Sequence, residues 1–326
     1  MWTWFEASER ILPLREGFRL PSRLPNRSEP DGTPAAGPRK GAVMSDRPSR
    51  ITVPWVREAR GRGTPLVMIT AYDAAQARLA DATDVDVVLV GDSLAMVVLG
   101  HPDTLSVTLD EMLHHVKAVR RGLERPLLVA DMPYGTFHLG PADTIANALR
   151  FVKEGGAQAV KIEGRRSEIV EALVGAEIPV MAHLGLTPQS VHRLGGFKVQ
   201  GRGESAARAL VAAAREVEEA GAFSLVLECV PSRLAAEVTA AVTIPTIGIG
   251  AGAACDGQVL VWHDLLGLEE RIAPRFVRRY AALGPTVKEA LAAFAADVRA
   301  GRFPSAAESY ADPSRPDGDS VERLYG

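Results

Sequence analysis

Cysteine is scarce in this sequence: only Cys229 and Cys255 occur in 326 residues, and no metal-type spacing relates them. This scarcity argues against a disulfide framework and is typical of proteins of a reducing cytoplasm. No apolar run approaches the roughly 18 residues that span a bilayer, which argues against a membrane protein. The formal charge of -3 gives no electrostatic reason to expect nucleic acid or an anionic membrane as a partner.

Sustained hydrophobic periodicity is missing at both ends of the chain. Residues 1–48 are rich in Pro, Arg, Ser and Gly, and we predict a disordered N-terminal extension there. The early acidic residues and the lack of an uninterrupted apolar segment argue against a secretory signal. Residues 49–305 carry the repeating pattern of one catalytic domain, and residues 306–326 form a polar C-terminal tail.

Short β-branched runs alternate with helical patterns from about residue 64 onward. Eight such runs predict an α/β fold, namely a closed parallel (β/α)8 TIM barrel. A doubly wound sheet is the alternative, but its GxGxxG signature after the first strand is absent. The connection between the last two runs is too short for a full helix. The runs cover residues 66–73, 86–92, 126–132, 157–163, 178–185, 223–229, 244–251 and 257–264.

Beyond the last run, residues 274–301 predict two further helices that pack on the barrel. Their pattern combines small and apolar residues with basic ones. These helices belong to the catalytic domain in this interpretation.

Four of the predicted strands run into an acid, at Asp92, Asp131, Glu163 and Glu228. In a closed parallel barrel the strand C-termini face one mouth, where active sites lie. Side chains alternate along a strand, so Lys161 and Glu163 point the same way. One acid alone more often caps a helix. Four ionised carboxylates close together repel one another by about 4 kcal/mol per close pair at an effective dielectric of about 20. A positive charge nearby is therefore expected to neutralise them.

Lys161 supplies one positive charge, and a hard divalent cation would supply two more. Oxygen ligands without a Cys or His cluster favour Mg²⁺ over Zn²⁺. Such an ion can chelate a small 2-oxo acid and act as a Lewis acid for enolate formation. The pattern therefore predicts a Mg²⁺-dependent site for a 2-oxo acid.

The sequence also resembles a known family from residue 51 to about residue 305. Its motifs are similar in order and spacing to those of ketopantoate hydroxymethyltransferases. The resemblance implies a (β/α)8 barrel like that of phosphoenolpyruvate mutase and isocitrate lyase, assembled as a homodecamer. The matching motifs are ITAYD (69–73), VGDSL (90–94), GHPDTLSVT (100–108), VKIEG (160–164), HLGLTPQSV (183–191), GGFKVQGRG (195–203), LVLECVP (225–231), IGIGAG (247–252) and DGQVLVWHDLLG (256–267).

The resemblance implies transfer of a hydroxymethyl group from 5,10-methylenetetrahydrofolate to 3-methyl-2-oxobutanoate, forming 2-dehydropantoate (ketopantoate) for pantothenate and coenzyme A synthesis. It also implies that Glu228 is the catalytic base that generates the enolate. The implied metal ion is Mg²⁺, and its ligands are Asp92, Asp131 and Glu163. The residues implied to bind the oxo acid are Asp92, Ser93, Asp131, Lys161 and His183.

Two other functions remain open from the residues themselves. One is a Mg²⁺-dependent carbon–carbon lyase or mutase of the same barrel type, although no cysteine-containing catalytic loop is evident. The other is a non-catalytic 2-oxo acid binding protein, in which Glu228 would be dispensable. The roles of Tyr72 and His263 are undecided, and strand alternation directs Cys229 away from the mouth.

Overall fold

The computed structural model describes residues 48–310 except 270 and 272–273. The predicted N-terminal extension, apart from residue 48, lies outside the described residues. So does the C-terminal tail from residue 311 onward.

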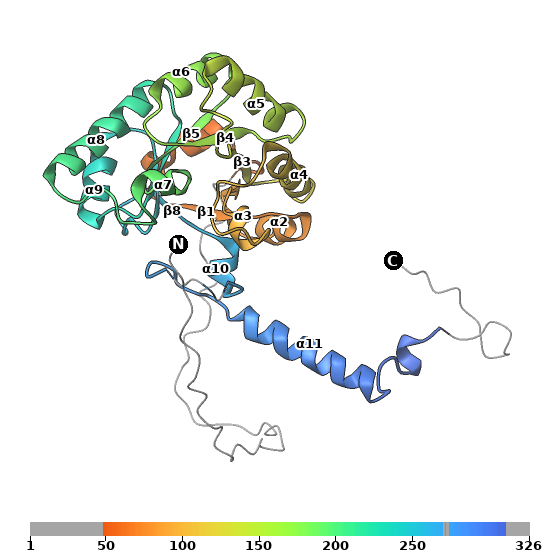
Figure 1. Ribbon diagram of the computed structural model, residues 1–326. Helices are drawn as coiled ribbons and strands as arrows, with labels where there is room; N and C mark the ends of the chain where they lie inside the picture. Colours follow the sequence, from red (N-terminus) through yellow and green to blue (C-terminus); the bar gives the residue numbers. More distant parts are fainter. Residues whose placement is uncertain (1–47, 270, 272–273, 311–326) are drawn as a thin grey trace, which may run out of the picture. The chain divides into compact units, whose positions relative to one another are not determined.

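A closed barrel of eight parallel strands forms the centre of the described chain (Figure 1). Each strand pairs with the next along the sequence, and β8 closes the ring against β1. All eight predicted strands are present, each shorter than its apolar run. They are β1 (Leu66–Thr70), β2 (Val87–Val90), β3 (Leu127–Asp131), β4 (Ala159–Glu163), β5 (Val180–Gly185), β6 (Ser224–Glu228), β7 (Thr246–Ile249) and β8 (Gly257–Leu260).

Helices follow most strands and surround the barrel, as the alternating pattern predicts. Residues 250–256 connect β7 to β8 without a helix, which confirms the predicted short connection. The two strands still pair, so the short connection does not prevent closure of the barrel. The helices are α1 (Val53–Arg57), α2 (Ala74–Asp81), α3 (Leu94–Val97), α4 (Leu109–Arg120), α5 (Pro141–Lys153), α6 (Ser167–Gly175), α7 (Val191–Leu194), α8 (Glu204–Glu219), α9 (Ser232–Ala241), α10 (Trp262–Leu266) and α11 (Leu283–Arg299), with 3-10 turns η1 (Ala59–Arg62), η2 (Pro188–Ser190) and η3 (Ala306–Glu308).

Helix α4 illustrates how the sequence sets an element's boundary. Thr108 precedes it, and the Thr108 side chain accepts a hydrogen bond from the Glu111 main-chain N–H at 3.2 Å. The Glu111 carboxylate in turn accepts one from the Thr108 N–H at 2.8 Å. This reciprocal cap satisfies two N–H groups that have no partner within the helix.

The apolar core has two parts because strand side chains alternate between the barrel interior and the helices. Met68, Leu89 and Val129 belong to the cluster of inward-facing strand residues. Val88 and Val90 instead join the cluster that contains the inner faces of the helices. At the C-terminal ends of the strands, inward-facing positions carry polar side chains, among them Asp131, Lys161 and Glu163.

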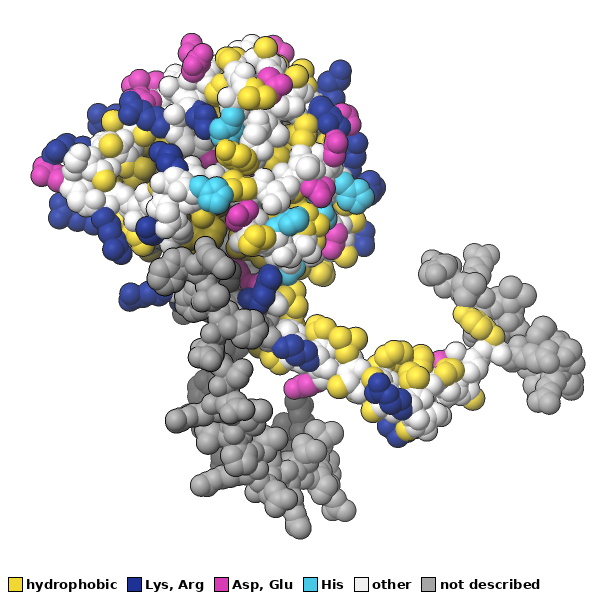
Figure 2. Space-filling model, viewed as in Figure 1, with side chains coloured by type: hydrophobic (Ala, Val, Ile, Leu, Met, Phe, Trp, Pro, Cys, Tyr) yellow, Lys and Arg dark blue, Asp and Glu magenta, His cyan; other side chains and the backbone are white. Residues whose placement is uncertain are grey.

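The C-terminal region differs from the prediction in one respect. Of the two helices expected over residues 274–301, one long helix is present, α11. Pro285 lies in its first turn, where a missing N–H is tolerated, and so is typical of a helix start rather than an interior. Its apolar side chains are largely exposed rather than packed on the barrel: Val287 is 47% exposed, Leu291 62% and Phe294 53%. Figure 2 shows hydrophobic side chains along this helix.

None of the described helices is both long enough and apolar enough to cross a bilayer.

Candidate active site

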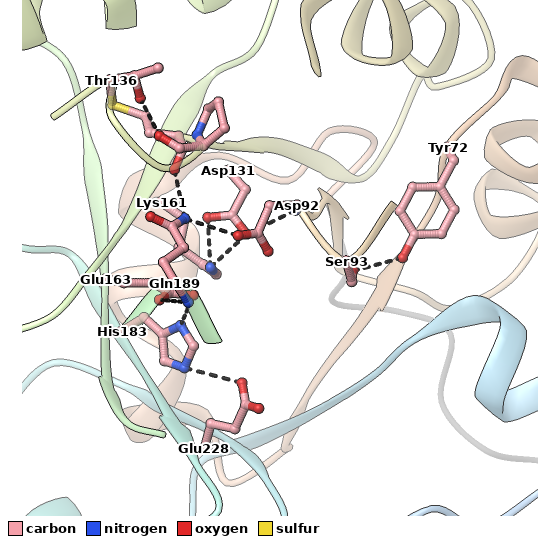
Figure 3. Close-up of polar contacts among 12 residues, drawn as sticks. Tyr72, Asp92, Ser93, Asp131, Thr136, Lys161, Glu163, His183, Gln189 and Glu228 are labelled. Atoms are coloured by element: carbon pink, nitrogen blue, oxygen red, sulfur yellow. Dashed lines mark hydrogen bonds and ion pairs between the residues drawn. The ribbon is translucent and has the colours of Figure 1, made fainter. Parts of the chain in front are cut away.

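Strand register brings the predicted site residues together at the C-terminal mouth of the barrel. Asp131 on β3 lies beside Lys161 on β4, and Glu163 on β4 lies beside His183 on β5. Glu228 ends β6, the next strand around the barrel. Figure 3 shows these side chains converging from separate strands.

Lys161 and Asp131 form a nearly fully buried ion pair. Lys161 Nζ lies 2.6 Å from Asp131 Oδ1 and 2.7 Å from Oδ2, so one ammonium holds both oxygens. Burial alone lowers the pKa of Lys161, but the carboxylates of Asp131 and Glu163 outweigh it and raise the pKa above its ordinary value. Lys161 is therefore a fixed positive charge at neutral pH.

Asp92 lies two residues beyond the end of β2, and Gln189 on η2 holds it in place. Gln189 Nε2 donates to Asp92 Oδ2 at 2.9 Å and to the Met132 carbonyl at 3.0 Å. The Gln189 main-chain N–H donates to Glu163 Oε2 at 3.0 Å. One buried residue thus fixes two carboxylates that are distant in the sequence. Sequence reasoning gave Gln189 no role, although it stands in the HLGLTPQSV motif.

His183 lies between two carboxylates at the mouth. Its Nδ1 is 3.5 Å from Glu163 Oε1 and its Nε2 is 3.2 Å from Glu228 Oε2, although neither contact has hydrogen-bond alignment. Burial and Lys161 lower the pKa of His183, but Glu163 and Glu228 outweigh them and raise it to about 9. Gly185 permits the close approach of β5 to β6, because a side chain there would collide with the Glu228 carbonyl.

Ser93 lines the mouth beside Asp92, and the Tyr72 hydroxyl lies 2.9 Å from its Oγ. Tyr72 is fully buried behind Ser93, so it supports this residue from outside the cavity. Asp73 accepts a hydrogen bond from the Gln76 N–H at 2.8 Å and caps α2. His263 belongs to α10 rather than to the last strand, and its ring lies against Tyr72.

A cavity of about 510 Å³ opens over these residues. Such a volume is typical of a site for a small organic ligand. Its floor carries the acids, and apolar strand residues such as Val226 form its wall. The described site residues that line it are Asp92, Ser93, Asp131, Lys161, Glu163, His183 and Glu228.

Cys229 also lines this cavity, so the prediction that it points away from the mouth was wrong. Its φ of 47° is in the left-handed region, and strand β6 has already ended at Glu228. The alternation of side chains therefore no longer applies at this residue. Burial raises the pKa of its thiol to about 11, which keeps it protonated at neutral pH.

The donor atoms fit a hard divalent cation in charge and type. Burial, followed by repulsion from Asp131 and Glu163, raises the pKa of Asp92 well above its ordinary value, which indicates uncompensated negative charge. The buried Glu163 Oε1 accepts no hydrogen bond from the described residues. Among those residues, however, no three His, Cys, Asp or Glu side chains already form a metal-binding group. Lys161 holds both oxygens of Asp131 in this conformation.

A closed parallel barrel with buried acids and a lysine at its C-terminal mouth defines a TIM-barrel enzyme. Solved structures share this architecture. A 2,3-dimethylmalate lyase, described as a member of the PEP mutase/isocitrate lyase superfamily, matches with a TM-score of 0.53 and 17% identity. The match covers 80% of this chain and 90% of that one. This similarity concerns the fold alone.

Similarity in sequence shows the family to which the chain belongs. The model of the ketopantoate hydroxymethyltransferase family matches residues 50–306. A 3-methyl-2-oxobutanoate hydroxymethyltransferase of Heliobacterium modesticaldum is 53% identical over 80% of this chain and 95% of its own length. An enzyme of the same name from Nitratidesulfovibrio vulgaris is 55% identical over 80% of this chain and 85% of its own. The chain belongs to the ketopantoate hydroxymethyltransferase family.

Proposed function

We propose that this chain transfers a hydroxymethyl group from 5,10-methylenetetrahydrofolate to 3-methyl-2-oxobutanoate, forming 2-dehydropantoate for pantothenate and coenzyme A synthesis. Membership of the ketopantoate hydroxymethyltransferase family supports this reaction. One water is consumed overall. Its hydroxyl goes to the transferred carbon, while its remaining proton and the C3 proton of the oxo acid go to the two folate nitrogens.

Glu228 is the base that removes the C3 proton. The observation that carries this assignment is its accessibility: the Glu228 side chain is 17% exposed, against 2% for Asp131 and 3% for Glu163. Of these three carboxylates, Glu228 is thus the one most open to a ligand in the cavity. His183 contacts its Oε2 and limits how the carboxylate turns. A positioned base contributes about 10²–10⁴-fold to a rate.

The oxo acid binds above the floor formed by Asp92, Asp131 and Lys161. Lys161 offers the positive charge that pairs with the substrate carboxylate, while Ser93 and His183 offer further polar contacts. Asp92, Asp131 and Glu163 would hold Mg²⁺, with water completing some contacts. When bound, this ion supplies Lewis-acid polarisation of the keto oxygen, which lowers the energy of the enolate.

An end-point assay tests the reaction. Purified chain is incubated with 3-methyl-2-oxobutanoate, 5,10-methylenetetrahydrofolate and Mg²⁺, and 2-dehydropantoate is measured by mass spectrometry. Formation of this product is expected from the parent chain. Cleavage of the oxo acid instead would indicate the lyase alternative, and tight binding without turnover would indicate a binding protein. Either result would overturn the proposal.

We also propose that the chain assembles as a homo-oligomer, with a decamer implied by the family resemblance. The exposed apolar residues of α11, including Leu291 and Phe294, support this proposal because water-exposed patches of this kind commonly mark interfaces. A cytoplasmic location is proposed as well. It is supported by Cys229 and Cys255, which are both free thiols.

A further inference from the structure

Ser93 and Tyr72 form a pair of hydroxyl groups beside the cavity. The Tyr72 hydroxyl lies 2.9 Å from Ser93 Oγ (Figure 3). Ser93 lines the cavity, whereas Tyr72 is only 1% exposed. In the part of the chain that the structure describes, the Ser93 side chain accepts no capping hydrogen bond from the N–H groups of α3. The Ser93 hydroxyl is therefore open to a ligand on one side and to Tyr72 on the other.

Three contacts hold Tyr72 in this position. Its main-chain N–H donates to Gln76 Oε1 at 2.9 Å. Its carbonyl oxygen can only accept, so His115 Nδ1, which lies 2.6 Å away, is the donor of the second contact. The third is the His263 ring, whose centroid lies 5.6 Å from that of the Tyr72 ring. The phenol therefore has a fixed direction.

Gly91 leaves the space that the Ser93 hydroxyl occupies. A Cβ at residue 91 would lie 2.9 Å from Ser93 Oγ, which is too close for two atoms that are not bonded. Any larger residue there would push the hydroxyl away from Tyr72 or out of its place at the cavity. The backbone thus accommodates the hydroxyl pair on the Ser93 side as well.

The direction of the hydrogen bond decides what Ser93 can offer to a ligand. A hydroxyl has one proton to donate and two lone pairs that accept. Burial raises the pKa of Tyr72, so its phenol keeps its proton at neutral pH. Thr70 is a second polar neighbour of the phenol, but its Oγ1 already accepts the Trp262 N–H at 2.9 Å. This arrangement favours donation from Tyr72 to Ser93 Oγ, which leaves the Ser93 proton for an acceptor in the cavity.

The oxo acid offers acceptors of this kind, because its carboxylate and keto oxygens have lone pairs and no proton. We propose that Tyr72 is a positioning residue that donates to Ser93 Oγ and thereby directs the Ser93 proton toward an oxygen of the oxo acid. Tyr72 is buried behind Ser93, so it acts through Ser93 rather than on the substrate. The inference rests on the proposed function.

Calorimetric titration of the full chain with 3-methyl-2-oxobutanoate and Mg²⁺ tests this role. Tyr72→Phe keeps the ring and removes the hydroxyl, so it should raise the Kd about three- to tenfold, the usual worth of one hydrogen bond. Ser93→Ala should raise the Kd at least as much. Adding Tyr72→Phe to Ser93→Ala should cause no further loss, because the residue through which Tyr72 acts is gone.

Exchange of the C3 hydrogen of the oxo acid in D2O gives a second readout. Tyr72→Phe should raise the KM of this exchange but leave its rate at saturating oxo acid near that of the parent, because Glu228 is untouched. Thr239→Val is the matched control. It removes a hydroxyl from another buried pair, in which Thr239 Oγ1 lies 2.8 Å from Thr246 Oγ1 at the start of β7, the end opposite the mouth. It should change neither the Kd nor the KM.

Three results would overturn the inference: parental affinity in Tyr72→Phe, an equal further loss when this change is added to Ser93→Ala, or an equal loss in Thr239→Val. The proposed function survives each of them if the parent chain forms 2-dehydropantoate. A parent chain that forms no 2-dehydropantoate would overturn the proposed function and the inference with it.

Discussion

Gln189 Nε2 lies 2.9 Å from Asp92 Oδ2, and this contact joins η2 to the loop after β2 across the cavity floor. The same residue donates its main-chain N–H to Glu163. Two acids expected to serve one ion thus accept hydrogen bonds from a single neutral residue, Asp92 from its side chain and Glu163 from its main chain. Gln189 therefore orients both carboxylates, a role that its residue type alone does not indicate.

Replacement of Gln189 by Leu should disturb both the fold and the site. It removes the side-chain donor to Asp92 and to the Met132 carbonyl, leaving buried acceptors unpaired at a cost of about 1–3 kcal/mol. Affinity for Mg²⁺ should fall about 10–100-fold, as is usual when a group that orients a metal ligand is lost. Chemical unfolding and calorimetric titration with Mg²⁺ measure the two effects. Parental Mg²⁺ affinity in this variant would show that Gln189 does not position the acids.

The buried pair of Lys161 and Asp131 gives a second prediction. Lys161→Met should reduce the free energy of unfolding by about 3–5 kcal/mol, because Asp131 is left as an uncompensated buried charge. Adding Asp131→Asn to this variant removes that charge and should recover much of the stability without restoring product formation. Urea unfolding of the parent, single and double variants measures the coupling. Equal stabilities of the single and double variants would contradict the prediction.

The raised pKa of Asp92 predicts that function and stability conflict at this residue. Burial and the nearby Asp131 and Glu163 disfavour its charged form, so Asp92→Asn should increase the stability of the metal-free protein by about 1–2 kcal/mol. The same change should weaken the response to Mg²⁺. Thermal unfolding with EDTA and with excess Mg²⁺ measures both. A variant that is destabilised in EDTA, or stabilised by Mg²⁺ as strongly as the parent, would refute this prediction.

His183 predicts a pH dependence of stability. Its pKa is raised from 6.5 to about 9 in the folded protein, so the folded state binds this proton more tightly than the unfolded state. The resulting stabilisation is fully present below pH 6.5 and is lost as the pH rises through about 9. The free energy of unfolding of the parent should therefore fall more steeply over this window than that of His183→Gln. Parallel curves for the two proteins would exclude the effect.

Much of the barrel could be predicted from the sequence because its strands are buried on both faces. Runs such as Val87–Val90 are continuously apolar and end near a polar residue, which locates both the strand and the mouth. The convergence of Asp131, Glu163 and Glu228 follows from that geometry alone.

Other features depend on strand register and local backbone geometry, which the pattern of residue types along the sequence does not show. The pairing of Lys161 with Asp131 requires the register between β3 and β4. Gln189 lies on a short 3-10 turn, where no periodicity indicates which side chains point inward. Cys229 was misplaced because its left-handed φ ends the alternation on which the prediction relied.

Proton abstraction by Glu228 is tested most directly by exchange of the C3 hydrogen of 3-methyl-2-oxobutanoate in D2O, followed by NMR with Mg²⁺ and without folate. The parent chain should exchange this hydrogen, and Glu228→Gln should slow the exchange by about 10²–10⁴-fold. Glu171→Gln, which changes an exposed glutamate on α6, is the matched control and should exchange like the parent. Exchange by Glu228→Gln at the parental rate would contradict the assignment of Glu228 as the base.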